Sequence, residues 1–157
     1  MSDSTCIDDR RSVTMSEIMT PNMVNFQGNI HGGFILQMLD RVAYVCASRY
    51  SEKNIVTLSA DEVVFKEPIY VGELVIFYST VNFVGSTSME VGIRVVAENL
   101  RTAVQRQTNS CYFTMVAVDE SGKPTKVKPL TLNTELQRKR FNDGLARRDA
   151  RLKMKAK

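Results

Sequence analysis

The sequence predicts an α+β fold, in which one long buried helix is followed by four long strands of an antiparallel sheet. The segment 34–48 has neither glycine nor proline and is apolar on nearly every side, as buried helices are. Four stretches rich in β-branched and alternating apolar residues follow, over 55–65, 74–84, 87–100 and 103–118. Their connections are short, and short connections favour antiparallel neighbours.

The chain of 157 residues is expected to form one domain, with a flexible arm over 1–12, a folded domain over 13–132 and a basic helix or tail over 133–157. From 137 to 157 there are nine Lys and Arg against two Asp, or +7, although the net charge of the chain is only +4. A solvated helix explains such a tail most simply, and a site for phosphate-bearing ligands or nucleic acid is the alternative. Because the remaining residues are acidic on balance, we expect no nucleic-acid partner.

Several classes of protein find no support in the sequence. Cys6, Cys46 and Cys111 have no CxxC or CxxH spacing, which argues against disulfides and structural zinc. His31 is the one histidine, so we expect no metal site of the kind that needs two. GxSxG, P-loop and GxGxxG sequences are absent. Without a signal-peptide core or an apolar run of membrane-spanning length, a cytoplasmic protein with no stable membrane anchor is expected.

A turn-rich segment stands directly before the predicted helix. Residues 12–19 are expected to form a short helix or an extended lead-in. Between 20 and 33 there are one proline, three asparagines and three glycines, which predict an irregular loop of the kind that often carries function. Within the helix, polar side chains recur at i, i+3 and i+4, so they share one face that should point at a cleft or a partner subunit: Gln37, Asp40, Arg41, Tyr44 and Ser48.

Asp40 is the most informative residue of this stripe, because burying an unpaired carboxylate is costly. We expect it either to pair with Arg41 of the partner subunit or a loop amide, or to act as a general base or nucleophile. Gly32 and Gly33 stand where the helix begins, and its free N–H groups can hold an oxyanion; a tight turn is the alternative. Asn25 is either a turn former or an amide that orients a water or a carbonyl.

The later strands carry candidates for phosphate binding. Arg94 interrupts an apolar strand, and we expect it either to form an ion pair between subunits or to bind a diphosphate. Arg106 and Arg101 are weaker candidates of the same kind. Four small or hydroxyl-bearing residues form either a plain hairpin turn or a contact with a phosphate or pantetheine chain: Gly85, Ser86, Thr87 and Ser88. Since one helix cannot cover both faces of the sheet and the strand edges need partners, we expect a dimer or a larger assembly.

As a set, these residues resemble the hotdog-fold acyl-CoA thioesterases, and most closely the single-domain bacterial cytosolic type related to the tandem-domain brain-type acyl-CoA hydrolases. The resemblance rests first on the sequence NFQGNIHGG over 25–33, with Asp40 fifteen positions after Asn25. It rests further on four segments, 56–59, 65–72, 85–89 and 111–119, and it covers about residues 13–131.

The resemblance implies a hotdog fold, with a long central helix wrapped by a single antiparallel sheet and two protomers pairing their sheets edge to edge, as a dimer or a trimer of dimers. It implies hydrolysis of acyl-CoA to free fatty acid and CoA by Asp40 of one subunit and Asn25 of the other. The backbone of Gly32 and Gly33 would hold the oxyanion, and no cofactor is required. The CoA-binding residues that it implies are Thr57, Gly85, Ser86, Thr87, Ser88, Arg94 and Arg106.

Two questions stay open at this point. A nucleotide effector is not decided by these residues. The alternative function is a hotdog module that binds acyl-CoA or a nucleotide without turnover. Members of the family differ at the position of His31, so the resemblance assigns it no catalytic role.

Overall fold

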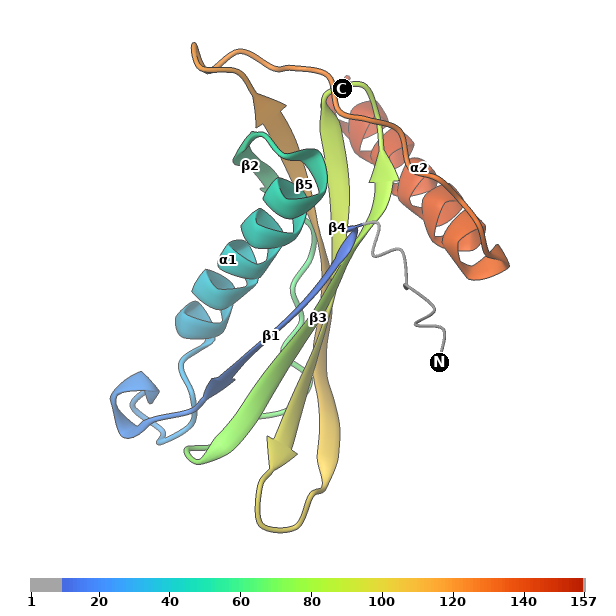
Figure 1. Ribbon diagram of the computed structural model, residues 1–157. Helices are drawn as coiled ribbons and strands as arrows, with labels where there is room; N and C mark the ends of the chain where they lie inside the picture. Colours follow the sequence, from blue (N-terminus) through green and yellow to red (C-terminus); the bar gives the residue numbers. More distant parts are fainter. Residues whose placement is uncertain (1–9, 157) are drawn as a thin grey trace, which may run out of the picture.

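The computed structural model describes residues 10–156 and contains one antiparallel sheet with a helix on each face (Figure 1). The elements follow the chain in the order β1 (Ser12–Ile18), a 3-10 turn (Pro21–Met23), α1 (Gly32–Ser51), β2 (Asn54–Ala60), β3 (Glu73–Val84), β4 (Ser88–Asn99), β5 (Gln105–Val118) and α2 (Glu135–Lys155). The predicted α+β class is therefore confirmed. Of the predicted flexible arm, residues 1–9 lie outside the described part of the chain.

The sheet has five strands rather than four, in the order β1-β3-β4-β5-β2, and every pair is antiparallel. Residues 12–18 form the first of these strands. Of the two conformations predicted for 12–19, a short helix or an extended lead-in, the extended one is therefore observed. The expectation that consecutive strands are all neighbours is wrong for β2 and β3. The long connection 61–72 carries the chain from β2 at one edge of the sheet to β3, which pairs with β1 near the other edge.

Helix α1 begins and ends at identifiable backbone signals. The Nδ1 atom of His31 accepts a 2.9 Å hydrogen bond from the N–H of Gly33, so the histidine caps the helix. At the other end Glu52 adopts a left-handed conformation (φ 57°) and its N–H returns to the carbonyl of Ser48. The buried side of α1, including Leu39, packs against the sheet.

Most of the polar stripe of α1 lies where the sequence predicts, away from this core; Ser48 is the exception, because its hydroxyl is buried. Gln37, Asp40, Arg41 and Tyr44 are all exposed. Apolar side chains are also exposed beside the stripe, on α1 itself and on the edge strand β2: Leu36, Val56 and Leu58. A partly apolar helix face next to an unpaired strand edge is a surface that needs a partner.

Helix α2 lies across the opposite face of the sheet from α1 (Figure 1). Its Phe141 ring lies 4.9 Å from that of Phe83, and the buried Gly144 lets the helix backbone approach β3 and β4 closely. Arg147 donates two hydrogen bonds, of 2.7 and 3.0 Å, to the buried carboxylate of Glu90. The basic C-terminal segment is therefore not simply a solvated helix, because one of its faces is docked on the sheet.

Candidate active site

A cavity of about 330 Å³ lies at the N-terminus of α1. The loop before the helix contributes Asn25, Asn29 and Ile30 to its wall, and the helix contributes Gly32 and Ile35. The other half of the wall comes from residues 65–69 of the connection between β2 and β3. The structure thus brings two of the predicted site residues, Asn25 and Gly32, into one concave site.

The side chain of Asn25 has a fixed orientation. Its Oδ1 accepts hydrogen bonds from the backbone N–H groups of Gln27 (2.9 Å) and Asn29 (3.2 Å). The first of the two predicted roles is therefore observed, because Asn25 organises the turn through its oxygen. Among the described residues the Nδ2 of Asn25 has no acceptor, and an amide donor held in this way can orient a carbonyl or a water.

The two glycines at the start of α1 are not equivalent. The N–H of Gly33 is already used by the His31 cap. Within residues 10–156, the N–H of Gly32 has no hydrogen-bond acceptor, and Gly32 lines the cavity. A free N–H at the positive end of a helix is suited to a developing oxyanion. Of the two predicted donors, Gly32 is the one that the protomer leaves available.

Asp40 lies two turns further along α1. Its Oδ1 accepts a 2.7 Å hydrogen bond from the Oγ1 of Thr57 on β2, so the structure brings these two predicted residues together. Asp40 is exposed in the protomer, makes no ion pair with the described residues, and does not line the cavity that contains Asn25. One protomer therefore presents the two halves of the predicted site at separate places.

The predicted CoA-binding residues other than Thr57 occupy three places. Gly85, Ser86, Thr87 and Ser88 lie at the hairpin between β3 and β4, and the strand register places Ser88, Val116 and Val56 in one row across β4, β5 and β2. The hairpin therefore lies level, across the sheet, with the part of β2 that carries Thr57.

Arg106 is held by carboxylates of its own chain. It donates to both oxygens of Glu73 (2.6 and 2.8 Å) and to Glu67 (3.0 Å). The hydrogen bond to Glu73 raises the pKa of Arg106. The positive charge of the guanidinium is balanced by carboxylates of the same protomer. Arg106 is therefore occupied rather than free to bind a phosphate.

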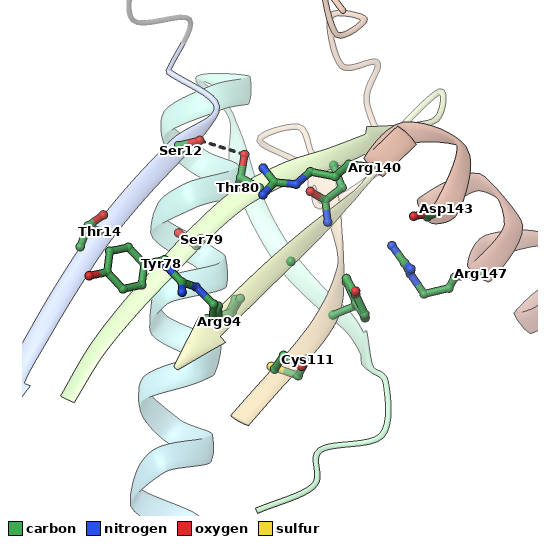
Figure 2. Close-up of a pocket in the computed structure, with 15 residues that line it drawn as sticks. Ser12, Thr14, Tyr78, Ser79, Thr80, Arg94, Cys111, Arg140, Asp143 and Arg147 are labelled. Atoms are coloured by element: carbon green, nitrogen blue, oxygen red, sulfur yellow. Dashed lines mark hydrogen bonds between the residues drawn. The ribbon is translucent and has the colours of Figure 1, made fainter. Parts of the chain in front are cut away.

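Arg94 lies on the face of the sheet that carries α2, stacked 4.6 Å from the centre of the Tyr78 ring (Figure 2). It lines a second cavity of about 380 Å³, here called the outer pocket. Arg140 of α2 also points toward this pocket, and hydroxyl groups surround it: Ser12, Thr14, Tyr78, Thr80 and Ser110. Within residues 10–156, neither Arg94 nor Arg140 has a carboxylate partner.

The remaining reactive side chains are buried or isolated. Burial raises the pKa of the Cys46 thiol to about 11 and that of Cys111 to about 12, so neither is a nucleophile at neutral pH. Cys6 lies outside the described residues. In the described part of the chain, His, Cys, Asp and Glu side chains form no group of three or more that could hold a metal ion. Between residues 10 and 156 there is also no helix with the length and apolar character of a membrane span.

Sequence reasoning missed two features of the site. One is the wall built by residues 65–69, although the segment 65–72 belongs to the pattern on which the family resemblance rests. The other is the set of ion pairs from α2, through Arg147 to Glu90 and through Arg151 to Asp61. A glutamate among apolar strand residues was a visible signal for the first pair, but its partner lies 57 residues away.

Comparisons with known proteins assign the chain to a family. A family model described as the thioesterase superfamily matches residues 27–104. Protein VdlD of Helicobacter pylori (strain ATCC 700392 / 26695) is 48% identical, over 91% of this chain and 82% of VdlD. The cytosolic acyl coenzyme A thioester hydrolase of Rattus norvegicus is 32% identical over 92% of this chain, which spans 38% of that longer protein.

A crystal structure of an apo-hexameric acyl-CoA thioesterase has a TM-score of 0.89 to this chain at 35% identity, and the match covers 94% of this chain and 95% of that one. The similarity extends over β1, the sheet and both helices rather than over an isolated motif. Together with the antiparallel sheet wrapped around α1, these matches show that the chain belongs to the thioesterase superfamily, among the hotdog-fold acyl-CoA thioesterases.

Proposed function

We propose that this protein hydrolyses acyl-CoA thioesters to free fatty acid and CoA. The observation that carries the proposal is the cavity at the N-terminus of α1. It is lined both by Gly32, whose N–H has no acceptor within residues 10–156, and by the oriented amide of Asn25. A thioester carbonyl placed there would meet two donors, and the carboxylate of Glu67 in the wall is already paired with Arg106. The family membership and the names of the relatives as acyl-CoA hydrolases support the same substrate class.

We propose further that a complete site needs two subunits. Asp40 and Asn25 of one protomer do not line the same cavity, whereas Asp40 lies beside the unpaired edge strand β2 and exposed apolar side chains. Pairing two β2 edges would cover this surface and could bring Asp40 to Asn25 of the partner subunit. The hexameric state named for a similar thioesterase makes a trimer of such dimers the assembly that we propose.

The chemistry follows from these parts. Asp40, oriented by Thr57, either removes a proton from water as it attacks the thioester carbonyl or attacks the carbonyl itself. The N–H of Gly32 stabilises the oxyanion, and the C–S bond breaks to release CoA as the thiolate, which takes up a proton. In the nucleophilic route water then hydrolyses the acyl-aspartate. Both routes consume one water and yield one acid and one thiol.

The proposed CoA path follows the subunit interface past residues 85–88. These residues start the hairpin at the level of Thr57, so a pantetheine chain lying across β2 could reach their hydroxyls. Arg94 lies on the other face of the sheet, so in this proposal it would serve CoA only from a neighbouring subunit. Because Arg106 is already paired with Glu73, we propose no direct phosphate contact for it.

The outer pocket supports a separate proposal, that a nucleotide effector binds there. Arg94 and Arg140 supply positive charge without a carboxylate partner within the described residues, and guanidinium groups suit diphosphates. Titration calorimetry with ADP and GDP tests this: binding that is lost in Arg94→Gln supports the site, and no binding to the wild type contradicts it. We also propose a cytoplasmic location, since the rat relative is named cytosolic.

The experiment that tests the function measures thiol release from acyl-CoAs of short to long chain by the wild type, Asp40→Asn and Asn25→Ala. We expect both variants to lose most turnover while their sedimentation stays that of the wild type. Asp149→Asn, which changes a carboxylate on the exposed part of α2, is the matched control and should keep full activity. Tight acyl-CoA binding without turnover by the wild type would instead favour the non-catalytic binding module.

A mixing experiment tests the two-subunit site. Asp40→Asn and Asn25→Ala protomers, dissociated together and reassembled, form mixed dimers in half of the cases if pairing is random. Each mixed dimer then has one site with both native residues, so about a quarter of wild-type activity should return. No recovery, with mixed dimers shown by mass spectrometry, would place both residues in a site within one protomer.

A further inference from the structure

The connection that walls the candidate active site is a long irregular segment, residues 61–69, here called the strap. Half of the cavity lining belongs to it, from Phe65 to Ile69. The Phe65 ring lies directly over Gly32, since a Cβ added at that glycine would be 3.5 Å from the ring. The position of the strap therefore sets the space in front of Gly32, whose N–H has no acceptor within residues 10–156.

The strap has no helix or strand of its own and depends on contacts with other elements. Towards its C-terminal end, Arg106 donates to the carboxylate of Glu67 and to the carbonyl of Pro68, both at 3.0 Å. The carbonyl of Ile69 then accepts a 2.8 Å hydrogen bond from Ile30, in the loop that carries Asn25. This end of the strap is therefore held by residues of the segment 13–131, which the family resemblance covers.

The N-terminal end of the strap is held from α2. Arg151 donates from Nη1 to both carboxylate oxygens of Asp61, at 3.0 and 3.2 Å, and the N–H of Asp61 bonds to the carbonyl of Tyr112 on β5. Arg147, one turn earlier on α2, stacks 3.7 Å from the centre of the Tyr112 ring and binds Glu90. The docked helix is thus the support from which Arg151 reaches the strap.

We propose that Asp61 and Arg151 are positioning residues for thioester hydrolysis, through which α2 sets the strap and the Phe65 wall of the active site. This inference rests on the proposed function. It assigns a role to α2, which lies outside the segment 27–104 that the family model matches. Neither residue touches the cavity, so the effect on the reaction passes through the strap.

The exposure of the pair separates a positioning role from a purely structural one. The side chains of Asp61 and Arg151 are 23% and 21% exposed, so their ion pair is partly solvated and contributes little to global stability. Active sites, in contrast, are sensitive to small displacements, since a shift of about 1 Å can cost on the order of 100-fold in rate. Removing the pair should therefore change catalysis more than folding.

The test compares Asp61→Asn, Arg151→Gln, the double variant and Arg151→Lys in the full-length assembly, with Lys139→Gln as a control on the exposed face of α2. We expect kcat for acyl-CoA hydrolysis to fall about tenfold in each single variant, with KM within about twofold of the wild type. The double variant should be no slower than either single variant, and Arg151→Lys should recover most of kcat. Melting temperature and sedimentation should match the wild type in Asp61→Asn, which leaves the 3.9 Å contact between Arg151 and Glu90 in place.

Hydrogen exchange gives a second readout that does not depend on turnover. Amides of the strap, such as that of Lys66, which bonds to the carbonyl of Thr108, should exchange faster in Asp61→Asn than in the wild type. Unchanged kcat, or losses that multiply in the double variant, would overturn the inference. A wild type that hydrolyses no acyl-CoA would overturn the proposed function instead. Unchanged exchange in Asp61→Asn would then independently reject the claim that the ion pair holds the strap in place.

Discussion

The buried ion pair between α2 and the sheet allows a quantitative prediction. Arg147→Met keeps much of the aliphatic volume but removes both hydrogen bonds to Glu90, whose side chain is only 1% exposed. Breaking a buried pair in this way typically costs about 3–5 kcal/mol, because the remaining charge stays uncompensated. Arg151, 3.9 Å from Glu90, offsets part of this loss, so we expect the free energy of unfolding to fall by about 3 kcal/mol.

The assay is urea unfolding at a fixed protomer concentration, followed by circular dichroism because the chain has no tryptophan. Limited trypsinolysis of the Lys- and Arg-rich α2 reports whether the helix undocks before the sheet unfolds. Replacing both partners, as Glu90→Met with Arg147→Met, removes the orphaned charge and should restore most of the stability. Lys139→Met, which breaks only an exposed pair on the same helix, should leave the unfolding midpoint unchanged.

The dependence of this loss on pH can also be stated. The hydrogen bond from Arg147 to Glu90 raises the pKa of the guanidinium above its usual value of about 12.5. Because the pKa is raised in the folded state, the stabilisation is complete at pH values below the pKa of the unfolded chain. It is lost only as the pH rises above that value. The deficit of Arg147→Met should therefore be constant from pH 7 to pH 9. A deficit under 1 kcal/mol with α2 resistant to trypsin would refute the reasoning.

Three further predictions concern individual side chains. Gly144→Ala normally strengthens a helix, but here the new Cβ would lie 2.8 Å from a side-chain carbon of the sheet, so thermal unfolding should show a destabilised protein. Because burial raises their pKa values to about 11 and 12, the thiols of Cys46 and Cys111 should resist iodoacetamide at pH 8 until the protein is unfolded, as peptide mapping would show. Thr57→Val removes the hydrogen bond to Asp40 and should lower kcat about tenfold without changing the melting temperature; an unchanged kcat would contradict the proposed orienting role.

Local sequence pattern was sufficient for the elements that carry their own signals. The long helix, the polar stripe with Asp40 and the turn-rich segment before Gly32 were predictable because periodicity and turn residues are local properties. The bounds differed from the prediction: α1 runs from Gly32 to Ser51, beyond the predicted 34–48, because His31 and Glu52 provide the caps.

The order of the strands was not predictable in the same way. Nothing local in 54–60 indicates that β2 pairs with β5 rather than with the next strand, since that choice depends on the path of the connection 61–72 and on the surface that α1 covers. The same holds for the phosphate candidates. Arg106 and Arg94 look alike in sequence, but one is paired with Glu73 and the other lines an open pocket.

By itself, the sequence determined the α+β class and the family, and it supplied the candidate residues for the proposed hydrolysis, because residue type and spacing carry that information. Only the tertiary structure decided that Gly32 rather than Gly33 has a free N–H, that the strap walls the cavity, and that α2 is docked by buried Glu90. These features join residues up to 90 positions apart, as in the pair of Asp61 and Arg151. Such contacts form only when the chain is folded and packed, so no local sequence pattern could predict them.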